Sequence, residues 1–212
     1  MNNPAAQKTW TAGMILATLA AVCTGLVAMT HRVTAPRIAA NEQAYLEARL
    51  KPVLEGVEYE GTLSESTLVI APPHALPGDD PVSVYRVFAN AEPVAALFVV
   101  TPRDGYSGPI SLLIGVAADD TVTGVRVLSH RETAGLGDQI EETKSDWILM
   151  FAGLSLDDPP AAAWRIRSDG GAFDQMTGAS ITSRSVVKAV KETLVYFDEN
   201  HADVFARMAD NE

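Results

Sequence analysis

The sequence predicts an α+β protein in which an N-terminal transmembrane helix precedes a mainly antiparallel sheet domain with packed helices. Three observations carry this prediction. An uncharged apolar run occupies residues 9–30, two hairpin patterns follow one another over residues 82–128, and a helical pattern begins at residue 184. The chain has 212 residues, 47% of them hydrophobic, so it is long enough to bury one core and to carry additional segments.

The run at residues 9–30 contains no charged side chain, and as a helix it is long enough to span about 30 Å of hydrocarbon. Trp10 lies at one end, where aromatic side chains anchor helices at the membrane interface. A cleaved signal peptide is the alternative. Because the run is long for a signal peptide and no clean cleavage site follows closely, we expect residues 1–31 to form a cytoplasmic N-terminus and a retained signal anchor.

Residues 32–82 are expected to connect this anchor to the main domain. Residues 34–54 carry apolar side chains at three-to-four spacing, which predicts an amphipathic helix, and Pro36 suits its first turn. The following stretch is rich in proline and glycine, so we expect it to be irregular apart from a short strand at residues 68–70.

The main domain is expected over residues 83–200. Strands at residues 82–89 and 94–100 form the first expected hairpin, and strands at residues 110–117 and 122–128 form the second, since a short turn segment separates each pair. The third strand alternates apolar and small residues, which indicates one buried face. The remaining expected elements are partial helix at 138–153, a strand at 164–167, a turn at 169–171, helices at 184–199 and 202–208, and a C-terminal tail at 201–212.

Composition excludes several classes of function. The net charge of −11 argues against nucleic-acid binding, since phosphates require a basic surface. Cys23 is the only cysteine and lies in the apolar run, so the rest of the chain offers no disulfide, thiolate metal site or iron–sulfur ligand. His130 and Glu132 are two positions apart, which is not the spacing of a helical zinc site, and no metal site is expected.

Four hydroxyl side chains gather at residues 177–183, immediately before the closing helix. Thr182 or Ser183 is expected to cap that helix by accepting a free backbone N–H. The free N–H groups and the dipole of a helix start also attract anions such as phosphate. Local chemistry alone favours a simple cap, and a phosphate seat beside a nucleophilic hydroxyl is the alternative.

Three stretches in order resemble a known family. Residues 174–180, Asp-Gln-Met-Thr-Gly-Ala-Ser, resemble the Asp-x-x-Ser/Thr-Gly-Ala-Thr/Ser pattern of covalently flavinylated proteins. Residues 130–137 resemble the same family's His-x-Glu-Thr-Pro-Gly-Leu-Gly, with Ala134 in place of proline. Together with the Gly-Tyr-Ser-Gly turn at residues 105–108 and the apolar N-terminus, they resemble the G subunit of the Rnf (Rsx) electron-transport complex. The C subunit of the sodium-pumping NADH:quinone oxidoreductase is a related protein.

This resemblance implies a site for FMN, which a flavin transferase joins through its phosphate to Ser180. Serine replaces the threonine that is usual there, and the hydroxyls of Thr177 and Thr182 are alternative acceptors. The other implied site residues form three groups: the phosphate seat (Thr177, Gly178, Ala179, Thr182), recognition by the transferase (Asp174), and weaker contacts to the flavin ring (Glu132, Thr133, Leu136, Gly137).

The implied function is a membrane-anchored flavoprotein subunit of an ion-translocating electron-transport complex of the ferredoxin/NAD type, without independent catalysis. The implied partners are the complex's other membrane and iron–sulfur subunits. The implied location is the bacterial inner membrane, with a single span and a periplasmic C-terminal domain. Lys8 flanks one end of the span and Arg32 and Arg37 the other, a charge bias that slightly favours the opposite orientation.

Two other classes of function are weighed against this one. The first is a cofactor-free, membrane-tethered scaffolding or binding subunit, which would be colourless and unmodified. The second is a hydrolase with Ser180 as nucleophile, which needs a base and an oxyanion hole. The chain lacks a Gly-x-Ser-x-Gly elbow and has only four histidines, so the hydrolase is disfavoured.

Overall fold

The computed structural model describes residues 14, 16, 20, 23–32, 34, 47–48, 50–54, 56–59, 63 and 66–206. The chain divides into two compact units, Met1–Leu46 and Glu47–Glu212. In the first unit, residues 23–32 are helical. Much of the anchor predicted at residues 9–30, and most of the helix predicted at residues 34–54, lie outside the described residues. Within the described part of the chain, no helix combines the length and the apolar character that crossing a membrane requires.

The second unit is built on a five-stranded antiparallel sheet in which neighbouring strands follow chain order. Its strands are β1 (Thr67–Ile70), β2 (Val82–Ala89), β3 (Glu92–Val100), β4 (Ser111–Ala117) and β5 (Val122–Ser129). They confirm the short first strand and both hairpins. These strands are predictable because the alternation and the turn signals that define them are local in sequence.

The turn between β2 and β3 is tighter than expected. Asn90 and Ala91 form it alone, with φ angles of 51° and 65° that suit a two-residue hairpin turn. The predicted turn at residues 90–93 is therefore too long, because β3 begins within it. Pro93 is tolerated in β3 because pairing with β4 starts only at Ala95.

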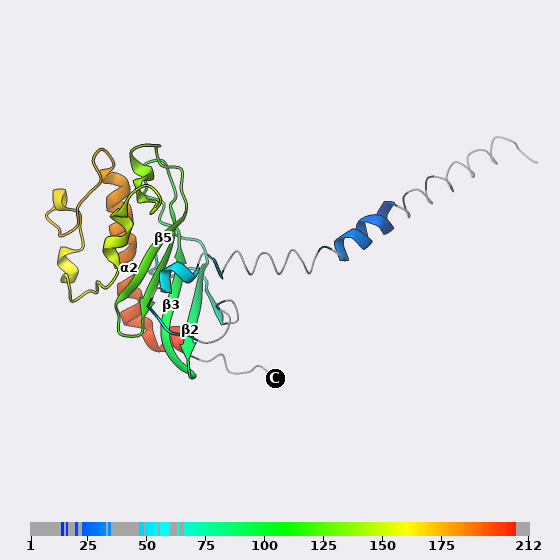
Figure 1. Cartoon of the computed structure of the whole chain (residues 1–212), viewed down its shortest axis with the longest axis horizontal. Helices are drawn as coiled ribbons and strands as arrows, with labels where there is room; N and C mark the ends of the chain where they lie inside the picture. The colour runs from blue at the N-terminus through cyan, green and yellow to red at the C-terminus, as the bar shows by residue number, and fades with distance from the viewer. Residues whose placement is uncertain are drawn as a thin grey trace, which may run out of the picture. The chain divides into compact units, whose positions relative to one another are not determined.

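The sheet is covered on one face by helix α2 (Ser180–Phe205) and on the other by the short 3-10 helix η1 (Lys51–Leu54), drawn in cyan in Figure 1. The apolar side chains of α2 recur at the predicted three-to-four spacing and share one core with Phe98 and Ile114 of the sheet. Facing η1, Gly115 makes room for Val53, since a Cβ at Gly115 would lie 2.5 Å from Val53 Cγ1.

Helix α2 is longer than the helix predicted at residues 184–199. It begins at Ser180 and continues through a non-helical residue, Asn200, to Phe205. Of the further helix predicted at residues 202–208, residues 202–205 are helical and Ala206 is the C-cap; residues 207 and 208 lie outside the described residues.

The segment between β5 and α2 is described throughout and contains short 3-10 helices. They are η2 (Gly137–Ile140), η3 (Asp146–Phe151), η4 (Ala161–Ala163) and η5 (Arg167–Asp169). η2 and η3 confirm the partial helix at residues 138–153, and Gly170, with φ of 78°, confirms the turn at residues 169–171.

The strand predicted at residues 164–167 is wrong. Ile166 makes one isolated bridge to Phe173. Trp164 donates its Nε1–H to the carbonyls of Ser155 (3.0 Å) and Pro159 (2.9 Å), and its ring lies 4.8 Å from that of Phe173. This stretch is therefore held by the packing of Trp164 and by backbone hydrogen bonds of Arg165 and Arg167 to Phe173, without a strand ladder.

Candidate functional site

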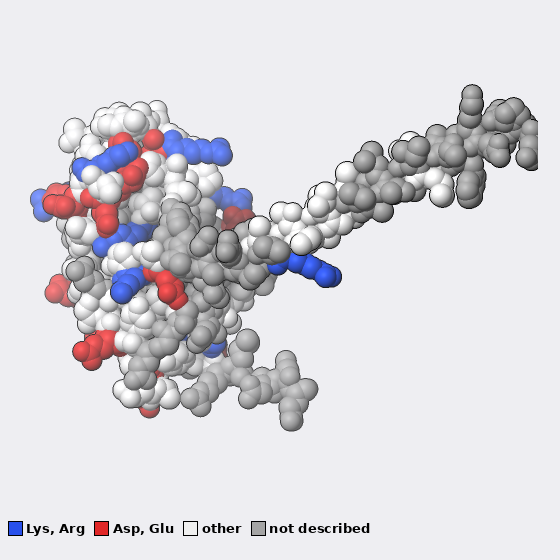
Figure 2. All heavy atoms as spheres, turned by 45° about the vertical axis from the view of Figure 1, so that its right-hand side comes forward, with Lys and Arg blue, Asp and Glu red and all other residues white. Residues whose placement is uncertain are grey.

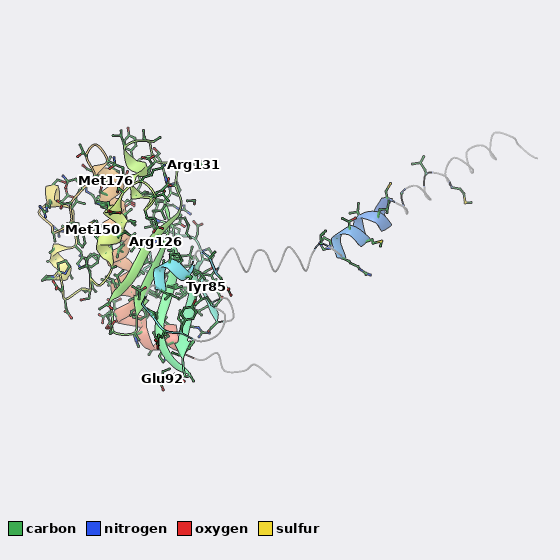
Figure 3. All side chains as sticks on the ribbon, in the orientation of Figure 1. Tyr85, Glu92, Arg126, Arg131, Met150 and Met176 are labelled. Carbon is green, nitrogen blue, oxygen red and sulfur yellow. The ribbon has the colours of Figure 1, made fainter. Side chains whose placement is uncertain are left out.

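A cleft of about 450 Å³ opens at the start of α2, a volume typical of cofactor sites. It is formed by three segments that are far apart in the sequence: the turn at 105–108, the loop at 130–137 and residues 178–182. Figure 3 labels Arg131, from that loop, and Met176, just before α2, toward the same end of the domain. The residues lining the cleft are Tyr106, Glu132, Thr133, Leu136, Gly137, Gly178, Ala179, Ser180, Ile181 and Thr182.

Most of the predicted site residues line this cleft: Ser180, Gly178, Ala179, Thr182, Glu132, Thr133, Leu136 and Gly137. Thr177 and Asp174 are not in its lining. Thr177 is exposed beside it. The Asp174 carboxylate is exposed and pairs with Arg167 Nε at 3.0 Å.

Tyr106 and Ile181 line the cleft but were not predicted as site residues. Tyr106 was detectable, since it lies in the Gly-Tyr-Ser-Gly turn that forms part of the family resemblance. Ile181 gave no signal beyond its place among the hydroxyl residues. Both side chains are unusually exposed for large hydrophobic groups, at 67% and 46%.

Glu132 joins all three segments of the cleft. Its side chain is nearly buried, with 8% of the residue exposed. Oε1 accepts a hydrogen bond from the Ser107 N–H (3.0 Å), and Oε2 accepts one from the Thr182 hydroxyl (2.6 Å). The Glu132 N–H donates to His130 Nδ1 (3.0 Å), so the proton of that ring lies on Nε2, which is 2.9 Å from Glu141 Oε1.

Two glycines leave space for this carboxylate. A Cβ at Gly105 would lie 2.9 Å from Glu132 Oε1, and a Cβ at Gly137 would lie 2.8 Å from Oε2. Gly135 and Gly178 have positive φ angles of 78° and 77°, which L-residues rarely adopt. The glycines around the cleft therefore serve two purposes: close approach to Glu132 at Gly105 and Gly137, and a left-handed backbone at Gly135 and Gly178.

The start of α2 differs from the predicted cap. Ala179 is the N-cap residue and no side chain caps the helix, so the prediction that Thr182 or Ser183 does so is wrong. The helix begins earlier than expected, so both hydroxyls lie inside it. Ser183 Oγ instead accepts from the Met176 N–H (3.1 Å) and donates to the Ala179 carbonyl (3.0 Å).

The three candidate acceptor hydroxyls have different environments. Ser180 is partly exposed in the cleft, and the described residues give its hydroxyl no hydrogen-bond partner. Thr182 is fully buried and engaged by Glu132. Thr177 is exposed outside the lining. The free N–H groups of the first turn of α2 lie beside Ser180, where an anion is favoured.

An ion-pair network supports the loop from outside the cleft. Lys144 Nζ lies 2.8 Å from Asp138 Oδ2 and 3.1 Å from Glu141 Oε1. The hydrogen bond from Lys144 lowers the pKa of Asp138. Hydrogen bonds from His130 and then Lys144 lower the pKa of Glu141. These groups hold residues 137–144 in place next to the cleft.

Charges of both signs are spread over the face of the domain seen in Figure 2, with acidic and basic side chains interspersed. Among the described residues, no group of three or more His, Cys, Asp or Glu is arranged to hold a metal ion. The lining of the cleft combines hydroxyl side chains, the start of α2 and the exposed apolar side chains of Tyr106, Leu136 and Ile181.

Comparison with known families defines the class of this domain. The FMN-binding domain family matches residues 105–195, a range that contains every residue lining the cleft. The RnfG N-terminal region matches residues 1–53.

Full-length relatives identify the particular family. The chain is 40% identical over 194 residues to the G subunit of the ion-translocating oxidoreductase complex of Pseudoalteromonas atlantica, covering 92% of this chain and 90% of the relative. It is 42% identical over 196 residues to the protein of the same name from Vibrio atlanticus (92% and 93%) and 38% identical over 207 residues to that from Shewanella oneidensis (98% and 96%). The chain belongs to the family of G subunits of ion-translocating oxidoreductase complexes.

Proposed function

We propose that this protein is a flavoprotein electron-transfer subunit of an ion-translocating oxidoreductase complex, and that the cleft at the start of α2 holds FMN. One observation carries the proposal: the residues matched by the FMN-binding domain family include the complete cleft lining. The names of the relatives support the role within a complex.

The chemistry of the cleft fits FMN at both ends of the molecule. Tyr106, Leu136 and Ile181 expose large apolar surface at the cleft, which suits a flat aromatic ring. The Ser180 hydroxyl and the first-turn N–H groups of α2 suit a phosphate. When bound, FMN supplies the reversible uptake and release of electrons, while the protein holds and orients it.

The finer proposal is a phosphodiester between the FMN phosphate and Ser180 Oγ. Ser180 is supported over Thr182 because the Thr182 hydroxyl is buried and bonded to Glu132. It is supported over Thr177 because Ser180 lines the cleft and Thr177 does not. The Ser180 hydroxyl gives up its proton as its oxygen bonds to phosphorus, and the leaving group departs from an activated flavin nucleotide supplied to the transferase. The protein thereby gains the mass of FMN less one water.

Two further site roles belong to this proposal. Thr133 and Leu136 contact the flavin from the loop, and Gly178 and Ala179 keep the backbone uncrowded at the phosphate. Asp174 is the residue that the flavin transferase reads, which its exposure and its position outside the cleft support.

The proposed setting is the bacterial inner membrane. A single anchor lies in residues 1–31, a connector in residues 32–82, the FMN-binding domain in residues 83–200 and a tail in residues 201–212, with the domain in the periplasm. The partners are the other membrane and iron–sulfur subunits of the complex. A periplasmic reporter fused after residue 212 tests this topology, and activity of the reporter only in the cytoplasm would refute it.

The linkage is tested by intact-mass measurement of the full-length protein produced together with a flavin transferase. The wild type is expected to gain one FMN less one water, and Ser180→Ala to gain nothing. Thr177→Ala and Thr182→Val serve as matched controls and are expected to keep the added mass. If Ser180→Ala still gains the mass of FMN and either Thr177→Ala or Thr182→Val loses it, the acceptor is the threonine whose substitution abolishes the addition. A wild type without bound flavin would overturn the proposed function itself.

A further inference from the structure

We infer that Glu132 is a positioning residue, whose buried carboxylate fixes the turn carrying Tyr106 to the first turn of α2. The inference rests on the proposed function, in which the cleft between these two segments receives FMN. The family resemblance implied instead that Glu132 contacts the flavin ring.

Both carboxylate oxygens of Glu132 are hydrogen-bonded to protein groups. One oxygen accepts from the Ser107 N–H and the other from the Thr182 hydroxyl, at 3.0 and 2.6 Å. Hydrogen bonds to a charged acceptor are about twice as strong as neutral ones. The two hydrogen bonds of Glu132 connect the turn at residues 105–108 to the first turn of α2. Both segments line the cleft, so this carboxylate sets the distance between them.

The burial of Glu132 has a cost that packing alone does not explain. The described residues provide it with no cation: the ion pairs near the cleft join Lys144 to Asp138 and Glu141. A buried carboxylate without a cation lowers stability unless hydrogen bonds satisfy it. An apolar residue of the same size would avoid that cost but could not hold Ser107 and Thr182.

The surrounding backbone is shaped around the same two oxygens. Gly105 borders Oε1 and Gly137 borders Oε2, each so closely that a Cβ would approach within 3 Å. Gly137 comes from the loop that carries Glu132, and Gly105 begins the turn that it holds. The carboxylate is therefore confined sterically as well as hydrogen-bonded, so it can hold the two segments in one relative position.

Substitutions at Glu132 can separate the effect of its two hydrogen bonds from the effect of its negative charge. Glu132→Gln keeps the shape: its amide oxygen can accept from Ser107 and its amide nitrogen can donate to Thr182 Oγ1. Glu132→Ala removes both bonds. Thr182→Val removes only the hydrogen bond to α2 and leaves no cavity. Glu142→Gln, at an exposed carboxylate that pairs with Arg126 outside the cleft lining, is the matched control.

The experiment measures amide hydrogen exchange at Ser107 in the full-length protein, with amides of β4 as an internal reference. Loss of the acceptor is expected to speed exchange at Ser107 by about tenfold in Glu132→Ala, since a net hydrogen bond is worth roughly that factor. Glu132→Gln is expected to restore slow exchange. Thr182→Val is expected to speed exchange in the first turn of α2, and Glu142→Gln to change nothing.

The second readout is the absorption spectrum of bound flavin, which responds to the contacts of the ring. Glu132→Ala is expected to shift it, and Glu132→Gln to match the wild type. Unchanged exchange at Ser107 in Glu132→Ala, or equal impairment by Gln and Ala, would overturn the inference. If Glu132→Ala does not fold, normal exchange in Thr182→Val overturns it. A wild type without flavin refutes the proposed function, while the exchange data still decide the role of Glu132.

Discussion

Removing the Ser183 hydroxyl is expected to destabilise the domain through the turn that precedes α2. Ser183 is fully buried, and its Oγ accepts from the Met176 N–H at 3.1 Å while donating to the Ala179 carbonyl at 3.0 Å. Ser183→Ala leaves the N–H of Met176, itself 5% exposed, without an acceptor. The hydroxyl that appears in the sequence as a helix cap thus closes the loop that leads to the cleft.

The magnitude follows from two opposing terms. An unsatisfied buried N–H costs about 1–3 kcal/mol. Alanine in place of serine within a helix returns about 0.5 kcal/mol of helix propensity. The free energy of unfolding is therefore expected to fall by roughly 1.5 kcal/mol, which for a domain of this size lowers Tm by about 3–6 °C.

Urea-induced unfolding of the full-length protein, followed by tryptophan fluorescence to which the buried Trp164 contributes, measures this change. The midpoint should fall with an unchanged slope, because the surface exposed on unfolding stays the same. Thr193→Val is the matched control: Thr193 is also buried in α2, but its hydroxyl only donates to the Ala189 carbonyl. A loss below about 0.5 kcal/mol in Ser183→Ala, or an equal loss in the control, would refute the reasoning.

Three other outcomes are expected. Gly115→Ala should lower the free energy of unfolding by about 1–3 kcal/mol in urea titrations, because its Cβ would crowd Val53. The hydrogen bond from Lys144 lowers the pKa of Asp138 below its ordinary 3.8. The ionised Asp138 carboxylate therefore contributes its full stabilisation of the fold above pH 3.8, and this contribution is lost as the pH falls through the lower pKa of the folded state. Asp138→Asn should therefore be less stable than the wild type at pH 7, and thermal unfolding should show the difference shrinking as the pH is lowered below 4. Tyr106→Leu should shift the absorption spectrum of bound flavin while Tyr106→Phe leaves it similar, since stacking needs the ring and not the hydroxyl.

Much of the sheet could be predicted from the sequence because its determinants are local. Alternating apolar residues and turn-forming pairs fixed the hairpins, and three-to-four spacing fixed the buried face of α2. The strand expected at residues 164–167 failed because Trp164 is held by carbonyls five and nine positions earlier and by the ring of Phe173. No local pattern records such contacts.

The cleft was predictable in its parts but not in its assembly. Motif resemblance selected most of the lining residues in two stretches. The hydrogen bonds that join the three segments of the cleft span 25 positions from Ser107 to Glu132 and 50 positions from Glu132 to Thr182. A sequence pattern does not give a contact between residues so far apart, so these two hydrogen bonds could not be predicted.

The strands that precede residue 105 support the cleft through the far half of α2. Phe98 of β3 is fully buried and meets Tyr196 and Phe197 edge to face, with ring centroids 6.5 and 6.0 Å apart. Phe197 lies about 25 Å along the helix from Ser180, at 1.5 Å per residue. Packing on β3 holds the far half of α2, while the hydrogen bond from Thr182 to Glu132 holds its first turn. The helix that carries Ser180 into the cleft is therefore held at two points by separate parts of the chain.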